Sequence, residues 1–183
     1  MAKSPKVLPS PVEICRRRRI NVLTMQGYVN LAVKALAMII AVLVVFTQVF
    51  MVTQQTGMGM FPAIEDGDLV LAYRLHRDYQ KGDVVVYTVA GTRYLGRILA
   101  RETDVVYMDD GGTLQINGTN QGGEIMYPTY AKPGTEYPYR VQEGSFYILG
   151  DYRTQTTDSR DFGSISLDDI QGKVITIVRR RGV

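Results

Sequence analysis

An almost uninterrupted apolar run at residues 35–52 constrains the fold of this chain more than any other feature. Only Thr47 and Gln48 are polar within it. As a helix rising about 1.5 Å per residue, the run would be roughly 27 Å long, near the shortest length that crosses a bilayer. Counting from Tyr28 lengthens the span, with Lys34 reaching toward the headgroups. We therefore expect a transmembrane helix over residues 35–52.

Charge is divided unevenly on the two sides of this run. Residues 1–52 carry a net charge of +6, with four arginines at 16–19, and the rest of the chain carries −3. Basic residues beside an apolar span favour the cytoplasmic side. This pattern predicts a basic cytoplasmic segment at residues 1–34 and an extracytoplasmic domain at residues 53–183. It also gives no basic body suited to nucleic acid.

Two other interpretations of the apolar run are weaker. A cleaved signal peptide would need a small-x-small site, which the residues after the run do not supply. A buried core helix would show an amphipathic period, which is missing. Cys15 is the only cysteine and His76 the only histidine. The outer domain therefore cannot form an internal disulfide or a cysteine-based metal site, and we expect no metal and no cofactor.

Residues after the apolar run have the composition of a mainly β domain. Short runs rich in β-branched and aromatic residues alternate with Gly- and Asp-containing turns, and the chain has 12 tyrosines. Residues 166–170 fit a single helical turn, and residues 117–139 read as a loop or small excursion. Asn117-Gly118-Thr119 matches a glycosylation sequon, but Asn-Gly after a strand is more simply a turn. The predicted strands are residues 68–73, 84–89, 93–100, 105–108, 113–116, 146–149 and 174–178.

Four motifs in sequence order resemble those of the type I signal peptidases. They are GMGMFPAI at 57–64, KGDVVVY at 81–87, YLGRIL at 94–99 and LGDYRTQTTDSRDFG at 149–163, which IQGKV at 170–174 continues. The resemblance covers about residues 35–178. It implies a signal-peptidase-like antiparallel β-sheet domain behind an N-terminal transmembrane helix.

The same resemblance implies that the catalytic pair of the family is absent. Active members use a serine as nucleophile and a neutral lysine as general base. Gly59 stands where the motif carries the serine, and Gly96 stands where it carries the lysine. The lysines after the apolar run, Lys81, Lys132 and Lys173, fall outside the positions of the family's cleft. We therefore interpret the chain as a pseudoenzyme with a degenerate dyad.

Other roles are implied by position in the motifs. Thr156 matches the hydroxyl residue that orients the catalytic lysine. Met60 and Phe61 have an alternative interpretation as core or membrane-contacting residues. The resemblance implies a groove edge and oxyanion-like backbone donors at Gly57, Gly59, Met60, Phe61 and Pro62, and a set that braces the site at Asp151, Arg153, Thr156, Asp158 and Arg160.

Three functions are compatible with these observations. The favoured hypothesis is a signal-peptidase-like factor that lacks the dyad and serves pilus assembly in Gram-positive bacteria. Its implied partners are pilin subunits and the lipid bilayer, with a sortase as a further candidate and no nucleic acid. The second is a type I signal peptidase that cleaves signal peptides although its Ser/Lys dyad is altered in this chain. The third is a structural membrane protein without a substrate groove.

Overall fold

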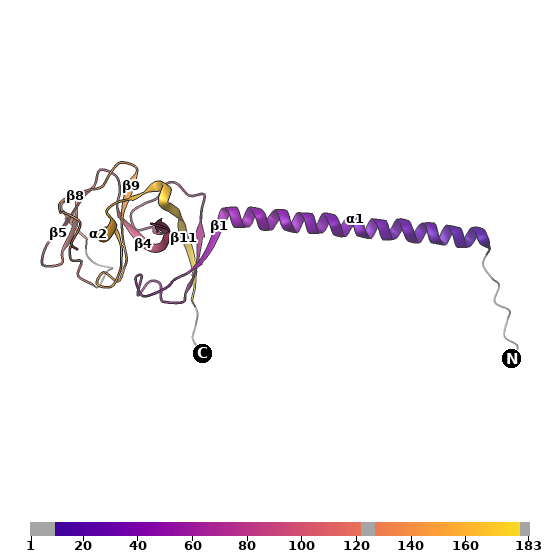
Figure 1. Ribbon diagram of the computed structural model, residues 1–183, viewed down its shortest axis with the longest axis horizontal. Helices are drawn as coiled ribbons and strands as arrows, with labels where there is room; N and C mark the ends of the chain where they lie inside the picture. Colours follow the sequence, from indigo (N-terminus) through magenta and orange to yellow (C-terminus); the bar gives the residue numbers. More distant parts are fainter. Residues whose placement is uncertain (1–9, 122–126, 180–183) are drawn as a thin grey trace, which may run out of the picture. The chain divides into compact units, whose positions relative to one another are not determined.

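The computed structural model describes residues 10–121 and 127–179. They form one long helix, two antiparallel sheets and short helical turns (Figure 1). The chain divides into two compact units between Thr47 and Gln48. The first unit holds nearly all of the helix, and the second holds both sheets. The mainly β fold class and the N-terminal apolar helix are therefore as predicted.

The long helix, α1, runs over Pro11–Val49. Two residues explain why the helix begins here. The Ser10 hydroxyl accepts a hydrogen bond from the Glu13 N–H at 3.3 Å, and Pro11 occupies the first helical position, where no N–H is needed. None of its residues is buried within the protein, and its length and apolar composition make it a candidate membrane span. The basic residues at 16–19 thus belong to the same helix as the apolar run.

The predicted helical span of residues 35–52 is wrong at its end. The helix stops at Val49, and residues 50–52 open strand β1, Phe50–Gln54, in register with β2, Leu69–Tyr73. The Phe50 and Tyr73 rings lie 5.7 Å apart. Apolar composition alone does not separate a helix from a strand. Here residues 50–52 form a strand because the edge of β2 provides hydrogen-bond partners for them.

The larger sheet has seven strands in the order β1-β2-β11-β3-β4-β9-β10. Each predicted strand that belongs to it is present, with ends that differ by a few residues. Beyond β1 and β2, its strands are β3 Val84–Val89, β4 Thr92–Ala100, β9 Ser145–Leu149, β10 Ile165–Ser166 and β11 Ile170–Val178. The helical turn expected at 166–170 is the 3-10 helix η1, Leu167–Asp169.

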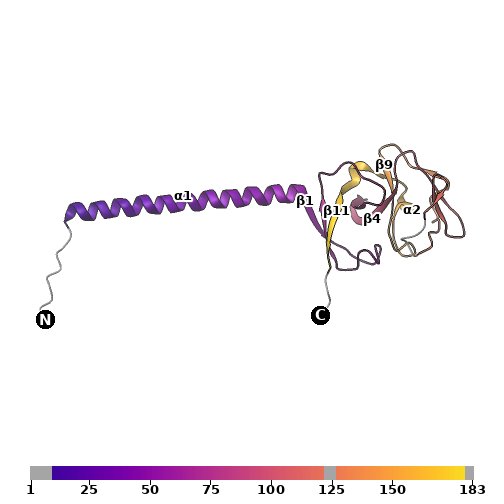
Figure 2. The same cartoon turned by 180° about the vertical axis from the view of Figure 1, so that it is seen from behind.

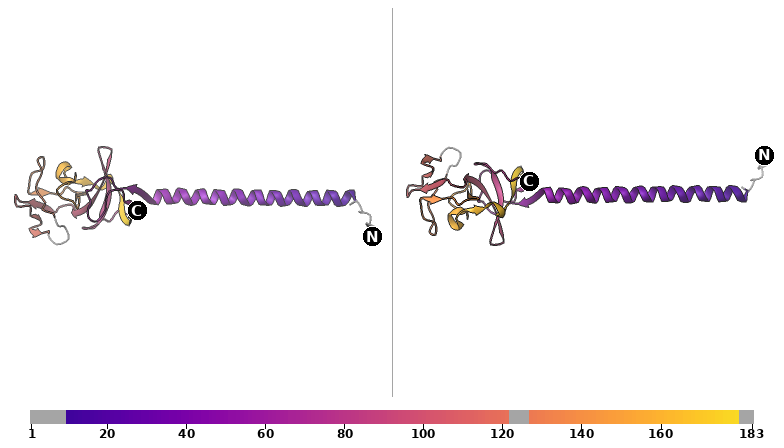
Figure 3. Two further views of the ribbon diagram at one scale, coloured as in Figure 1. Left: turned by 90° about the horizontal axis from the view of Figure 1, so that it is seen from below. Right: turned by 90° about the horizontal axis from the view of Figure 1, so that it is seen from above.

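The excursion expected at 117–139 contributes β7 and the first residue of β8 to a smaller sheet, and residues 122–126 of it lie outside the described residues. The order of this sheet is β7-β6-β5-β8, with β5 Val105–Met108, β6 Leu114–Ile116, β7 Thr119–Asn120 and β8 Tyr139–Arg140. Within the second unit these strands lie at one end and β11 at the other, with β9 between them (Figures 1 and 2). The views from below and above agree (Figure 3). Asn117 forms the predicted turn, and its side chain accepts from the Val105 N–H at 2.8 Å.

The last sequence motif is held against β9 by a short helix. This helix, α2, covers Ser159–Phe162. The Ser159 hydroxyl accepts from the Ile148 N–H at 2.9 Å, and the Tyr137 and Tyr147 hydroxyls lie 2.6 Å apart. The motif therefore links the large sheet to the segment that carries the small one.

Candidate functional site

A groove of about 280 Å³ lies where the edges of two strands are left open. β1 pairs only with β2, and residues 92–96 of β4 pair with β3 alone, because β9 joins β4 only from Arg97 onward. Free edges of this kind carry backbone groups that can pair with a further strand. The groove is lined by Thr53, Gln54, Gln55, Thr56, Gly57, Met58, Gly59, Arg93, Tyr94, Leu95, Gln155, Thr156 and Thr157.

Gly59 lies in this lining, where a side chain would have nearly enough room. A methyl carbon added at Gly59 would be 3.2 Å from the hydroxyl oxygen of buried Thr156, so a shift of a few tenths of an ångström would admit it. The Gly59 carbonyl accepts from the Tyr152 N–H at 3.0 Å. Gly150 packs so closely below that a methyl carbon there would lie 2.5 Å from the same carbonyl oxygen. The backbone at position 59 is thus firmly held.

Gly96 has different surroundings. It lies in β4 opposite Val85 and is buried. A methyl carbon added there would be 2.5 Å from Cγ2 of Ile148 and 3.2 Å from Cε1 of Tyr87. The first distance is well inside van der Waals contact, and Cγ2 belongs to a β-branched side chain with few alternative rotamers. The space that a lysine side chain would need is therefore occupied by the core.

Tyr87 fills part of that space with a phenol that has no partner. The side chain is fully buried, its ring stacks on Tyr94 at 5.7 Å, and its hydroxyl has no hydrogen-bond partner among the described residues. Burial, followed by the charge of Asp158, raises the pKa of Tyr87 far above its usual range. The phenol stays neutral and cannot take over the role of a general base.

The structure also brings Lys132 to the back of the site. Its ammonium group donates to the Thr156 carbonyl at 2.6 Å and to the Asp161 carboxylate at 2.7 Å. Sequence reasoning placed this lysine in the excursion, and no local pattern indicated its contact with Thr156, which is 24 residues away. Lys81 and Lys173 also form ion pairs, with Asp104 at 2.9 Å and Asp83 at 2.8 Å. All three lysines after residue 52 therefore carry carboxylate partners.

Asp158 and Arg160 form a buried ion pair behind the groove. Two hydrogen bonds join the guanidinium to the carboxylate, at 2.9 and 2.8 Å, and both side chains are at most 2% exposed. Arg160 also donates to the Arg153 carbonyl at 2.6 Å. Asp158 caps α2 by accepting from the Arg160 N–H. This charge-assisted network holds the last motif rigidly.

Asp151 and Arg153 do not pair with each other. Asp151 accepts two hydrogen bonds from Arg97, at 2.9 and 2.7 Å. Arg153 donates to the Gly150 carbonyl at 2.8 Å and to the Thr129 hydroxyl at 2.7 Å. Burial lowers the pKa of Arg153 to about 10, so its guanidinium is still charged at neutral pH. Each residue thus ties the loop after β9 to a different neighbour.

Gly57 lines the groove but lacks the expected role, and three other expected groove residues lie outside the lining. The Gly57 N–H donates to the Asp66 carboxylate at 2.6 Å, so it is not available as an oxyanion donor. Met60 is fully buried in a core cluster, and its alternative interpretation as core is the correct one. Phe61 packs on Tyr152 at 6.1 Å, and neither it nor exposed Pro62 is among the groove-lining residues.

The groove is instead lined by a polar stretch that sequence reasoning did not single out. Residues 53–56 read Thr-Gln-Gln-Thr directly after the apolar run, and Gln155 and Thr157 face them. The signal was available, because the apolar run changes abruptly to four consecutive polar residues at this point. The Gly59 N–H donates no hydrogen bond to the residues that the structure describes.

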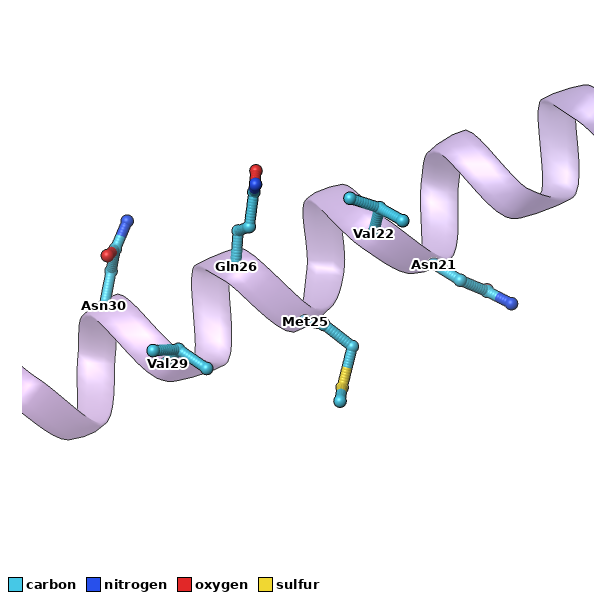
Figure 4. Close-up of a pocket in the computed structure, with 6 residues that line it drawn as sticks. All are labelled: Asn21, Val22, Met25, Gln26, Val29 and Asn30. Carbon is cyan, nitrogen blue, oxygen red and sulfur yellow. The ribbon is translucent and has the colours of Figure 1, made fainter.

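Two remaining features carry no site chemistry. A hollow on α1 is formed by a single helix face, and its side chains point apart along that face (Figure 4). Across residues 10–121 and 127–179, no three His, Cys, Asp or Glu side chains gather as metal ligands would. His76 lies 2.8 Å from the Asp78 carbonyl and edge-on to Tyr79, in a packing role.

Comparison with known proteins places this geometry in a family. The model of the family "Signal peptidase, peptidase S26" matches residues 28–179. Signal peptidase IB of Staphylococcus aureus (strain Mu50 / ATCC 700699) is 31% identical over 152 residues, which are 68% of this chain and 76% of that protein. Signal peptidase I of Bacillus licheniformis is 27% identical over 118 residues, which are 57% of this chain and 63% of that protein.

A solved structure is also similar. The crystal structure of a signal peptidase I from Enterococcus faecalis V583 superposes with a TM-score of 0.45 at 24% sequence identity, covering 54% of this chain and 97% of that one. The family model extends over most of the chain, from within α1 to the end of β11. The chain therefore belongs to the signal peptidase family, peptidase S26.

Proposed function

We propose that this chain is a non-catalytic, signal-peptidase-like membrane protein that binds an extended polypeptide segment without cleaving it. One observation carries the proposal: a methyl carbon at position 96 would lie 2.5 Å from Ile148. A lysine base needs room for four methylenes and a route to the nucleophile. The core around Gly96 gives it neither.

The lining of the groove also supports a non-catalytic function, because it lacks the nucleophile that cleavage would need. No serine is among the described residues that line it, and its hydroxyl groups come from four threonines and Tyr94. Position 59 itself has no side chain. The three lysines after residue 52 are each held in an ion pair with a carboxylate, and none of them is among the described residues that line the groove. The described residues of the groove therefore supply neither the serine nor the lysine of a Ser/Lys dyad.

Binding, by contrast, needs only what the groove retains. Its two walls are the free edges of β1 and of residues 92–96 in β4, and the Gly59 N–H points to no described acceptor. An extended segment could form main-chain hydrogen bonds along either edge, as in strand addition. These groups bind a chain whether or not a reaction follows.

In the cell, we propose a role in pilus assembly at a Gram-positive membrane. The helix α1 would anchor the protein with its N-terminus in the cytoplasm, since the arginines at 16–19 precede the apolar run. The β unit would then face pilin subunits outside, holding a pilin segment or presenting it to a sortase. This step rests on the resemblance to dyad-free signal-peptidase-like factors.

An active signal peptidase is the second candidate, because the relatives matched here bear that name. Cleavage would require a nucleophile and a base other than the residues at 59 and 96. Incubating the purified full-length chain with a preprotein separates the two candidates. We expect no cleavage product above the blank, and turnover would favour the peptidase.

Groove occupancy can be tested in cells with a matched pair of variants. Thr157 and Thr154 are both exposed in the same loop, but only Thr157 lines the groove. In a strain that lacks the gene, we expect Thr154→Trp to restore pilus polymerisation and Thr157→Trp to fail, at equal protein levels. If pili form normally without the gene, the pilus role is wrong. If both variants restore pili, the groove is not the binding site.

A further inference from the structure

We infer that the segment bound in the groove carries an acidic side chain, Asp or Glu, which pairs with Arg93. This inference rests on the proposed binding function and specifies the chemistry of the ligand. It starts from the composition of the lining, in which uncharged polar residues surround a single charged one.

Among residues 10–121 and 127–179, Arg93 is the only charged residue that lines the groove, and none of them places a carboxylate in the lining. The side chain is exposed, and its contact within the described residues is a long hydrogen bond of 3.4 Å to the neutral hydroxyl of Thr53. Other arginines of the same unit have ionic partners: Arg97 pairs with Asp151 and Arg160 with Asp158. Arg93 has no such partner among the residues that the structure describes.

The position of Arg93 matches what a bound strand would meet. It lies on β4 within residues 92–96, where the edge toward the groove is unpaired. A segment adding to this edge would run beside Arg93, and alternate side chains of that segment would face it. A guanidinium forms charge-assisted, often two-pronged hydrogen bonds with a carboxylate.

The rest of the lining disfavours an apolar ligand. Thr53, Gln155 and Thr157 present hydroxyl and amide groups, so burying Leu- or Val-rich segments against them would leave polar groups without partners. A polar segment with one carboxylate satisfies both the amides and the cation. Electrostatic complementarity thus selects among extended ligands that the strand edges alone would accept equally.

The test uses the full-length chain in detergent micelles and three fluorescein-labelled peptides with amidated C-termini. The peptides are Thr-Thr-Val-X-Val-Thr-Thr, with Glu, Gln or Lys at X, so that threonines flank X on the same face of the strand. Binding is followed by fluorescence anisotropy at low and high salt. We expect the Glu peptide to bind about fivefold more tightly than the Gln peptide, with the Lys peptide weakest, and the difference to shrink in salt.

Two variants identify the partner. Arg93→Gln should abolish the preference for Glu, while Arg140→Gln, which changes an exposed arginine on β8 outside the groove lining, should retain it. Equal binding of all three peptides, or a preference for Glu that survives Arg93→Gln, would overturn the inference and leave groove binding intact. Failure of every peptide to bind, in the parent chain as well, would overturn both.

Discussion

Gly59 and Gly96, the two positions that the sequence motifs align with the dyad of the family, differ in what surrounds them. At position 59, the nearest obstacle to a methyl group is one hydroxyl oxygen at 3.2 Å, in an open, hydrated groove. At position 96, a methyl group meets the Ile148 side chain at 2.5 Å inside the core. A serine could return to the first site with a small adjustment, whereas a lysine could return to the second only if the core moved. A lysine at position 96 is therefore harder to accommodate than a serine at position 59.

The largest expected effect comes from forcing a lysine into position 96. Gly96→Lys should lower the free energy of unfolding by at least about 4 kcal/mol, because overpacking costs about 1–3 kcal/mol and a poorly solvated ammonium adds several more. Urea unfolding of the full-length chain, followed by near-UV circular dichroism of its tyrosines, measures the loss. Gly96→Ala isolates the steric part and should cost about 1–3 kcal/mol. A Gly96→Lys variant as stable as the parent would show that the core around position 96 can rearrange to accommodate the lysine.

The second prediction concerns the buried ion pair between Asp158 and Arg160, which lies behind the groove. Asp158→Asn keeps the shape and the capping oxygen but leaves buried Arg160 without its counter-charge, so we expect a loss of about 3 kcal/mol. The matched change is Asp161→Asn, which weakens the half-exposed pair with Lys132 and should cost less than about 1 kcal/mol. The same unfolding assay compares them. Equal losses would mean that burial of the Asp158–Arg160 pair has no energetic consequence.

A smaller effect of opposite sign is expected beside position 96. Tyr87→Phe removes a buried hydroxyl that has no described partner, so it should raise the free energy of unfolding by about 1 kcal/mol. Tyr147→Phe is the control, because it removes a hydroxyl that lies 2.6 Å from the Tyr137 hydroxyl and should lower stability by about 1 kcal/mol. If Tyr87→Phe destabilises as much as Tyr147→Phe, the Tyr87 hydroxyl has a partner after all.

These contrasts also mark how far sequence reasoning reaches. Strands such as β3 and β5 follow from local runs of β-branched residues, and the turn at Asn117 from its Asn-Gly pair. The boundary at Val49 does not follow from the sequence, because the pairing of β1 with β2 links residues about 20 positions apart. Local patterns report what a segment can form. They do not report which neighbour completes it.

In the candidate site, too, local motifs predicted the positions of residues but not their contacts. The motifs located Gly59, Gly96 and the Asp158–Arg160 pair within one structural region, but the details depended on nonlocal contacts. Asp66 takes up the Gly57 N–H, and Lys132 reaches Thr156 from 24 residues away. Whether Gly96 is a cavity or a filled space depends on side chains from β3 and β9. No spacing rule in one strand contains that information.

The smallest structural effect is expected at position 59, and it tests the comparison most directly. Gly59→Ser should change the free energy of unfolding by less than about 1 kcal/mol, since the contact with Thr156 requires a shift of only a few tenths of an ångström. The variant should nevertheless leave a preprotein uncleaved, because no lysine is among the described groove-lining residues to take the serine proton. Mass spectrometry of the incubated preprotein, beside unfolding of the same sample, gives both readouts.

Either readout can contradict this expectation in its own way. A large loss of stability would show that the groove at 59 is as tightly packed as the core at 96, which would erase the difference between the two positions. Cleavage by Gly59→Ser would show that a base is present, and Lys132 would be the first to examine, since it already contacts the Thr156 carbonyl. Adding Lys132→Met would then abolish that cleavage if Lys132 is the base. Continued cleavage would move the search to a base outside the lysines of this unit.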